Sequence, residues 1–315
     1  MTQHPRPADA DREFVAGAYD LHVHVGPDVV PRSVDDLTLA RRFAEVGLAG
    51  FVLKSHYVPT AERASVVRAA VPGVDVLGAL ALNVASGGMN PTAVEIAARS
   101  GARLVWFPTV DSVNQRESKA EAPAGATPPM WAALQEDLRA QGIDPPPVRV
   151  VDESGAVRDD VVAVLTLMAK HDLVLATGHL SAAEILVVVR AAAEVGLRRM
   201  IVTHPEFTSQ RLTADQQAEL VDLGAYMERC FTTPYTGKVE WDVMIDNIRR
   251  TGPEHSFLSS DLGQPSNPPV EDGLPLMARH LLDAGFSEEE VRTMAVDNTT
   301  LLAAQPVTAT AESVR

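Results

Sequence analysis

The sequence has little cysteine, few basic residues relative to acidic ones, and no long apolar run. Its one cysteine, Cys230, excludes an internal disulfide framework and a cysteine-based zinc cluster. There are 27 Lys and Arg against 42 Asp and Glu, and the net charge of −15 argues against nucleic acid and anionic membranes as partners. Glycines and a proline interrupt the longest uncharged stretch, residues 76–94, and residues 1–14 are too polar for a secretory signal. We therefore expect a soluble, cytoplasmic α/β protein whose partner is a small molecule.

Short apolar runs alternate with helical segments along most of the chain. The runs are nearly continuous in apolar residues, which is typical of parallel strands covered by helices on both faces. They lie at residues 19–25, 50–57, 74–83, 103–110, 173–179, 199–204, 225–231 and 255–261. Several of the intervening segments begin with a helix-capping pattern, in which Ser or Thr precedes an acidic residue or Gln by three positions. These patterns start at Ser33, Ser181, Thr213 and Ser287, and Asn90-Pro91 is a further N-cap signal.

Eight strand–helix units predict a (β/α)₈ TIM barrel. The alternative is an open, doubly wound sheet, but eight repeats with nothing left over match the barrel. Residues 111–160 interrupt the alternation with six prolines and a short predicted helix near residues 131–141, and we interpret them as an elaborated loop after strand four. Its proline content favours a rigid cover over the barrel end. We expect one domain over residues 18–305, with residues 1–17 and 306–315 as flexible tails. A homo-oligomer is compatible with the sequence, which carries no pattern for it.

Polar residues gather where the predicted strands end. In a TIM barrel the catalytic residues lie at the carboxyl ends of the strands. Five of the nine histidines fall there, although a hydrophobic core rarely accepts so many. The strand ends carry Asp20-Leu-His-Val-His24, Lys54-Ser-His56, Thr177-Gly-His179, Thr203-His204, Glu228 and Ser259-Ser-Asp261. We interpret this end of the barrel as the active site.

His22 and His24 are the first candidate metal ligands. Two residues apart on a strand, their rings point to the same side. Burying two imidazoles is costly unless a partner satisfies them, and a divalent metal does so. The alternative is a pair of hydrogen-bonded histidines in a polar cleft. The presence of His179, His204 and Asp261 at the ends of other strands favours the metal. For ligands of the His and Asp type we expect zinc first, with manganese, iron or nickel as alternatives.

This constellation resembles the amidohydrolase superfamily. The resemblance covers residues 19–304 and rests on Asp20-Leu-His-Val-His24, Thr177-Gly-His179, Val202-Thr-His-Pro205 and Ser260-Asp261. It implies a metal-dependent barrel enzyme that hydrolyses amides, esters and related bonds. It further implies that His22, His24 and Asp261 bind one metal and that Asp261 handles the proton of the attacking water. His179 and His204 would bind a second metal, or one would join the first site while the other polarises the substrate.

The end of strand four departs from the family pattern. Members with two metals commonly carry a carboxylated Lys or a Glu there, whereas this chain has Trp106-Phe-Pro-Thr109. A lysine occurs instead at the end of strand two. Lys54 has three interpretations: a carbamate that bridges metals, a cation that holds an anionic substrate or an oxyanion, or a lysine that reaches solvent. The number of metals, one or two per chain, therefore stays open.

The remaining candidates have weaker signals. We expect His56 to bind substrate or to support a ligand, with a surface loop position as the alternative. Glu228 is predicted as a site acid or a partner of a ligand, or else it forms a salt bridge with Arg229 or Lys238. Trp106 lines the substrate pocket or packs in the core. We expect Cys230 to be a small core residue, and His171, His255 and His280 to lie outside the site.

The predicted chemistry is hydrolysis of an amide, lactone or cyclic amide by a metal-activated water. Asp261 would move the proton, and Lys54 or a histidine such as His204 would polarise the carbonyl oxygen. The first alternative is a one-metal decarboxylase or hydratase on the same scaffold, which the missing strand-four ligand favours. A phosphoesterase of the polymerase-and-histidinol-phosphatase type would carry a further His near Asp261, which the sequence lacks. A barrel that binds metal without catalysis is the third alternative.

Overall fold

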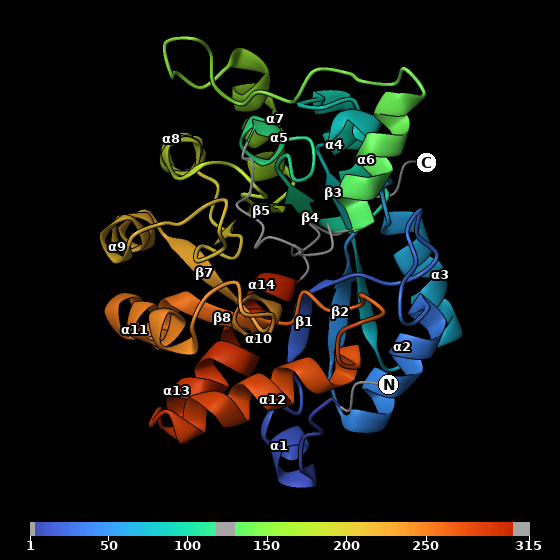
Figure 1. Cartoon of the computed structure of the whole chain (residues 1–315), viewed down its shortest axis with the longest axis vertical. Helices are drawn as coiled ribbons and strands as arrows, with labels where there is room; N and C mark the ends of the chain where they lie inside the picture. The colour runs from blue at the N-terminus through green and yellow to red at the C-terminus, as the bar shows by residue number, and fades with distance from the viewer. Residues whose placement is uncertain (1–3, 118–129, 305–315) are drawn as a thin grey trace, which may run out of the picture.

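The computed structural model describes residues 4–117 and 130–304. Its centre is a sheet of eight parallel strands in the order β1 to β8 (Figure 1). The strands β1 and β8 also meet, because the backbone N–H of Asp261 donates to His22 and that of His24 donates to Leu262. The predicted TIM barrel is confirmed. The strands are β1 Tyr19–Val23, β2 Gly50–Leu53, β3 Asp75–Ala81, β4 Ala102–Trp106, β5 Val174–Ala176, β6 Met200–Val202, β7 Ala225–Cys230 and β8 Ser256–Ser259.

Helices surround the barrel (Figure 1). Those that connect consecutive strands are α2 Asp36–Val46, α3 Ala61–Ala70, α4 Pro91–Arg99, α7 Asp159–Lys170, α8 Ala182–Glu194, α9 Ala214–Asp222 and α11 Trp241–Thr251. After β8 come α12 Val270–Asp283, α13 Glu288–Arg292, the π-helical η3 Thr293–Asp297 and α14 Asn298–Ala303. Shorter elements are η1 Val84–Ser86, α10 Thr232–Tyr235 and η2 Pro253–His255. In the described part of the chain, no helix is both long and apolar enough to cross a membrane.

Most of the predicted helix starts are confirmed. Ser181, Thr213 and Ser287 each form a capping box with the residue three positions later, and Asn90 caps α4. The prediction for α2 is wrong by two residues, because the side chain of Asp35 accepts from the Thr38 backbone and takes the capping position predicted for Ser33.

The prediction of an N-terminal tail over residues 1–17 is wrong for the described residues. Residues Asp9–Phe14 form the helix α1, which packs against α12. Asp11 pairs with Arg279 at 2.7 Å and Arg12 pairs with Asp272 at 2.5 Å. These partners are about 260 residues away in the sequence, so no local sequence pattern predicts the contact between α1 and α12. The predicted tail at residues 306–315 lies outside the described residues.

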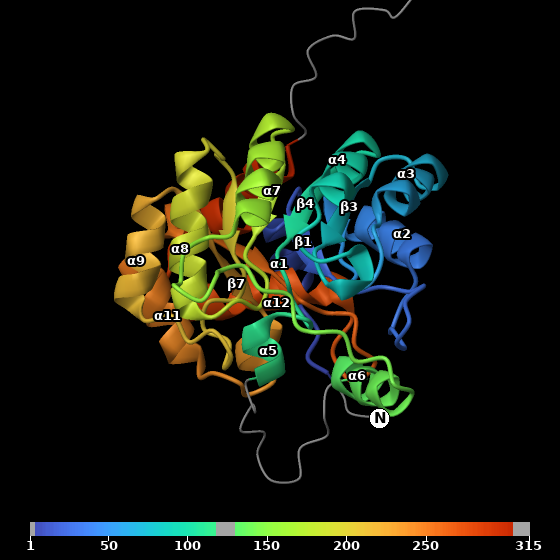
Figure 2. The same ribbon diagram turned by 90° about the horizontal axis from the view of Figure 1, so that it is seen from above.

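The described part of the insertion after β4 lies at the carboxyl end of the barrel. It contains α5 Val113–Glu117 and α6 Met130–Ala140, and the predicted helix near residues 131–141 is confirmed. Both helices lie beyond the ring formed by helices such as α7 and α8 (Figure 2). The turn at residues 152–155 joins a short antiparallel pair, Val151 with Val157. Three of the prolines from which we predicted a rigid cover, Pro123, Pro128 and Pro129, lie outside the described residues.

The barrel interior is divided into an apolar and a polar part. The apolar part includes Leu21, Val52, Leu104, Trp106 and Phe257, and the residues Leu302 and Ala303 of α14 pack against it. The helices pack on the outside through two further clusters of buried apolar residues. The polar side chains therefore meet at the opposite end, where the strands finish.

Candidate metal centre

A cavity of about 430 Å³ opens at the carboxyl ends of the strands. It collects side chains from five strand ends, and the start of α6 covers part of it. The strand-end residues that line it are His24, Lys54, His56, His179, His204 and Asp261, and the residues from the insertion are Met130 and Trp131. The structure thus brings together the residues that we predicted from the strand ends.

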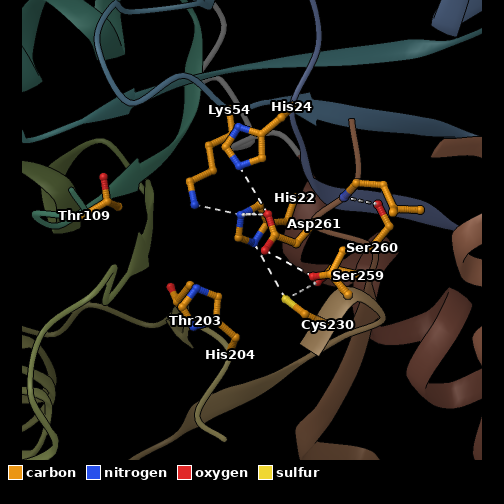
Figure 3. A network of polar contacts seen from close by, with 12 residues as sticks. His22, His24, Lys54, Thr109, Thr203, His204, Cys230, Ser259, Ser260 and Asp261 are labelled. Atoms are coloured by element: carbon orange, nitrogen blue, oxygen red, sulfur yellow. Dashed lines mark hydrogen bonds and ion pairs between the residues drawn. The ribbon is translucent and has the colours of Figure 1, made fainter. Parts of the chain in front are cut away.

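A register shift in β1 turns its two histidines toward Asp261, and His24 lines the cavity. The pairing of β1 with β2 is irregular between Asp20 and Val23. Leu21 packs in the barrel interior while Val23 packs on the outer side with the helices. The irregularity places the side chains of both His22 and His24 toward Asp261 (Figure 3), which is how bulges commonly re-aim side chains at active sites.

His22, His24 and Asp261 form a compact group of potential ligands. The Nε2 atoms of His22 and His24 lie 3.1 and 3.2 Å from Oδ1 of Asp261. Asp261 has a positive φ of 51°, and so does His204 at 28°. Such backbone conformations are rare outside glycine and collect at functional sites. The carboxylate and the two imidazoles are a donor set that suits zinc and other divalent metals.

Glu228 orients His22 through Nδ1, the ring nitrogen that does not face Asp261. Its Oε1 lies 3.0 Å from Nδ1 of His22, and its Oε2 accepts from the backbone N–H of His204 at 3.2 Å. The Ser259 hydroxyl also donates to Oε1 at 2.9 Å. A carboxylate that receives one ring N–H leaves the other ring nitrogen free to bind a metal, which is the usual support of a ligating histidine. The alternative of a salt bridge between Glu228 and Arg229 is wrong, because Arg229 points to the other face of β7 and pairs with Glu206.

The charges around His22 favour a positive charge at this point. Burial and Lys54 lower its pKa, but Asp261 and Glu228 outweigh them and raise it to about 9. Burial raises the pKa of Asp261, yet His22 and His24 hold it well below its usual value. A divalent cation would supply the positive charge that these two carboxylates attract.

The four histidines that line the cavity are held neutral. Burial holds the pKa of His24, His56 and His179 well below the ordinary value and lowers that of His204 to about 4. Neutral imidazole is the form that binds metals. The Nδ1 atoms of His24, His179 and His204 are buried without a hydrogen-bond partner among the described residues. Such orphaned atoms fit a site completed by a metal or by its waters.

His179 and His204 face the same cavity but stand apart from the compact group. Their ring centroids are 5.1 Å apart, and that of His204 is 6.0 Å from His22. Gly178 is required before His179, because a Cβ there would lie 2.3 Å from the Phe107 carbonyl oxygen. The backbone N–H of His179 then donates to Pro108. We keep their assignment as ligands of a second metal, or of the first, as a prediction.

Lys54 lies inside the site. It is buried, its Nζ is 2.7 Å from Nε2 of His22, and it lies 5.1 Å from the ring centroid of Trp106. The alternative of a lysine that reaches solvent is therefore wrong. Burial lowers the pKa of Lys54, although Asp261 and Glu228 act in the opposite direction. The interpretations as a carbamate or as a cation both stay open.

Comparison with known proteins places the chain in a family. Residues 17–228 match the model of a family of unknown function, DUF6282. The chain belongs to the DUF6282 family. No curated protein matches its sequence.

The DUF6282 chain is similar in fold to solved enzymes. An amidohydrolase from Pseudomonas aeruginosa is 10% identical at a TM-score of 0.59, covering 94% of this chain and 98% of that one. The dipeptidase AC, a metallopeptidase, is 13% identical at 0.57, covering 92% and 98%. A 2,6-dihydroxybenzoate decarboxylase is 12% identical at 0.53, covering 91% and 99%. The resemblance to the amidohydrolase superfamily is thus confirmed in the fold.

Two predicted substrate-binding residues of the DUF6282 protein lie behind the cavity. Trp106 is 1% exposed, packs beneath Lys54 and belongs to the interior apolar cluster. Glu228 is 2% exposed and contacts His22 rather than the cavity. His56 does line the cavity. We now expect substrate contact from His56, with Trp106 and Glu228 acting through Lys54 and His22.

Sequence reasoning missed several cavity residues that come from loops. Arg32 follows β1, Phe207 follows β6, Lys238 follows α10, and Gln264 and Asn267 follow β8. Their loops carry no pattern beyond their position after a strand. Cys230 is buried, as predicted, and its Sγ lies 3.8 Å from Nδ1 of His22. It does not line the cavity, and burial raises the pKa of its thiol well above the usual value.

The histidines predicted to lie outside the site do so. His171 pairs with Glu95 at 2.7 Å, His280 stacks on Trp241, and His255 lies in η2 at the amino end of β8. None of the three lines the cavity.

Proposed function

We propose that this protein is a metal-dependent hydrolase that cleaves an amide, lactone or cyclic amide in a small molecule. One observation carries the proposal. Two imidazole Nε2 atoms, from His22 and His24, meet one carboxylate oxygen of Asp261 within 3.2 Å at the wall of a cavity. The fold likeness to an amidohydrolase and a metallopeptidase supports the reaction class. Zinc is the metal we expect, with Mn²⁺ or Fe²⁺ as alternatives.

Different residues at the cavity have different roles in the proposed reaction. A divalent metal, when bound by His22, His24 and Asp261, acidifies water and polarises a carbonyl group. Asp261 is ionised and accepts a proton at the carboxylate that faces the cavity. Lys54 presents a positive charge, or a donor, to an oxygen of the substrate. Met130 and Trp131 restrict access of water from the side of α6.

A decarboxylase is the second candidate. The end of β4 offers Thr109 instead of a carboxylate or lysine, and the Thr109 hydroxyl is engaged with His56 and Asn83. One compact group of ligands therefore opens to the cavity in the described part of the chain. A single metal suits decarboxylation as well as hydrolysis, and the fold likeness extends to a decarboxylase.

Metal analysis and two assays on the full-length protein test the proposal. Metal per chain is measured by mass spectrometry, and hydrolysis is followed on esters, lactones, cyclic amides and dipeptides. Release of carbon dioxide is followed on aromatic carboxylates. Hydrolysis that a chelator abolishes and zinc restores supports the proposal, whereas metal-dependent release of carbon dioxide alone favours the second candidate. Bound metal without turnover in either assay indicates a binding barrel, and absence of tightly bound metal contradicts all three.

A further inference from the structure

The end of β4 holds a hydrogen-bond chain that is distinct from the metal ligands. It runs from Asn83, after β3, through Thr109, after β4, to His56, after β2. All three side chains are at most 5% exposed. The Nδ2 atom of Asn83 lies 2.6 Å from the Thr109 hydroxyl, and that hydroxyl lies 2.8 Å from Nδ1 of His56.

The donor and the acceptor of each hydrogen bond that links Asn83, Thr109 and His56 can be assigned. The Oδ1 atom of Asn83 accepts from the backbone N–H groups of Thr109 at 2.8 Å and Asp111 at 3.3 Å. Its Nδ2 donates to the backbone carbonyl of His56 at 2.8 Å. These three contacts fix the orientation of the amide. Asn83 therefore donates to the Thr109 hydroxyl oxygen as well.

The Thr109 hydroxyl proton then has one available acceptor among the described residues. With its oxygen occupied by Asn83, the hydroxyl donates to Nδ1 of His56, which is its other hydrogen-bond partner among the described residues. The reverse assignment would leave a buried hydroxyl proton without an acceptor, which is unfavourable. An imidazole that accepts at Nδ1 carries its proton on Nε2.

We propose that Asn83 and Thr109 hold His56 as a neutral imidazole whose Nε2–H donates a hydrogen bond to an oxygen of the substrate. The class of group it recognises is a carboxylate or a carbonyl. No described residue hydrogen-bonds to Nε2 of His56, and the ring lines the cavity beside His24, with ring centroids 5.0 Å apart. A nitrogen that carries a proton is not a metal ligand, so His56 binds substrate rather than metal. The part concerning the substrate rests on the proposed function, whereas the tautomer does not.

The surroundings of the cavity suit an oxygen anion as the group bound by His56. Among the described residues, the cavity is lined by three basic side chains, those of Arg32, Lys54 and Lys238, and by one carboxylate, that of Asp261, which contacts His22 and His24. Arg32 pairs with Asp28 at 2.6 Å. Lys238 lies 4.5 Å from the ring centroid of Phe207 and has no acidic partner among the described residues. The local excess of positive charge contrasts with the net charge of −15 for the chain.

Nitrogen-15 NMR of the histidine rings tests the tautomer directly. We expect the full-length protein, as purified and again after loading with zinc, to show His56 as a single neutral Nε2–H form, identified by its loss in His56→Gln. Thr109→Val should abolish this single form, and Thr109→Ser, which retains the hydroxyl, should restore it. Asn83→Asp cannot donate to Thr109, so the hydroxyl turns to the new carboxylate and His56 switches to the Nδ1–H form.

Acetate serves as the probe for the donor role. Titration of acetate should produce a saturable shift of the His56 Nε2–H signal in the wild type and in Thr109→Ser, but not in Asn83→Asp. His56→Gln should keep the metal content of the wild type. An Nδ1–H form in the wild type overturns the inference, as does loss of one metal per chain in His56→Gln or the absence of any shift with acetate. A protein without bound metal but with the Nε2–H form would overturn the proposed function and leave the tautomer standing.

Discussion

Two adjacent residues of β7 place opposite charges on opposite faces of the barrel wall. Glu228 points inward, where it contacts His22 and the backbone of His204. Arg229 points outward to the helices, where it pairs with Glu206. Both side chains are at least 98% buried. Alternation along a strand is sufficient to separate them.

The two faces differ in how completely their buried polar groups are hydrogen-bonded within the protein. On the outer face Arg229 donates to four side chains, those of Glu206, Gln217, Thr251 and Ser256. On the inner face three histidines keep an Nδ1 atom without a partner among the described residues. The outer network is mostly closed within the protein and serves stability, whereas the inner one is open to a ligand. Substitutions on the two faces should therefore separate stability from metal binding.

Removing both β1 histidines should have the largest effect. His22→Ala together with His24→Ala takes away two of the three ligands in the compact group, so we expect metal content to fall to background with the barrel still folded. Mass spectrometry measures the metal, and circular dichroism with thermal unfolding measures the fold. The matched control is His171→Ala, which removes a histidine that pairs with Glu95 and does not line the cavity. Full metal retention by the double variant would refute the site.

Breaking the outer ion pair should have the largest effect on stability. Arg229→Met leaves Glu206 buried without its cation, and we expect a loss of about 3–5 kcal/mol in the free energy of unfolding. Urea denaturation of metal-free protein measures it. The double change Arg229→Met with Glu206→Leu should recover much of that loss, because no uncompensated charge remains. Metal content per folded chain should not change, and a metal loss equal to that of the histidine variant would contradict the separation of the faces.

The same contrast shows what sequence alone can predict. The eight strands followed from nearly continuous apolar runs, and the histidines at their ends followed from the position of catalysis in such barrels. The face of β7 on which Glu228 lies could not be predicted, because the alternation of Glu228 with Arg229 does not show which of the two residues faces inward. The link of His56 to Asn83 and Thr109 joins three strand ends, and only the closed barrel brings them together. The docking of α1 on α12 depends on ion pairs between the two ends of the chain.

Lys54 gives a prediction on the inner face alone. Lys54→Met removes the charge next to His22 but keeps an apolar stem of similar length against Trp106. Loss of a group that stabilises charge in the transition state costs about 10²–10³-fold in kcat. We expect a loss of that size with little change in the free energy of unfolding, since burial of the ammonium is itself unfavourable. Unchanged turnover would place Lys54 outside the reaction.

Glu228→Gln is the mildest of these changes and discriminates best between the faces. The amide keeps an oxygen for Nδ1 of His22, but its NH₂ group meets the backbone N–H of His204, which now has no acceptor. Loss of such a supporting carboxylate weakens metal binding by about 10–100-fold. Competition with a zinc chelator measures the affinity, and Glu206→Gln, its counterpart on the outer face, is the control. If Glu206→Gln weakened zinc binding as much, Glu228 would act through the general stability of β7 and not by orienting His22.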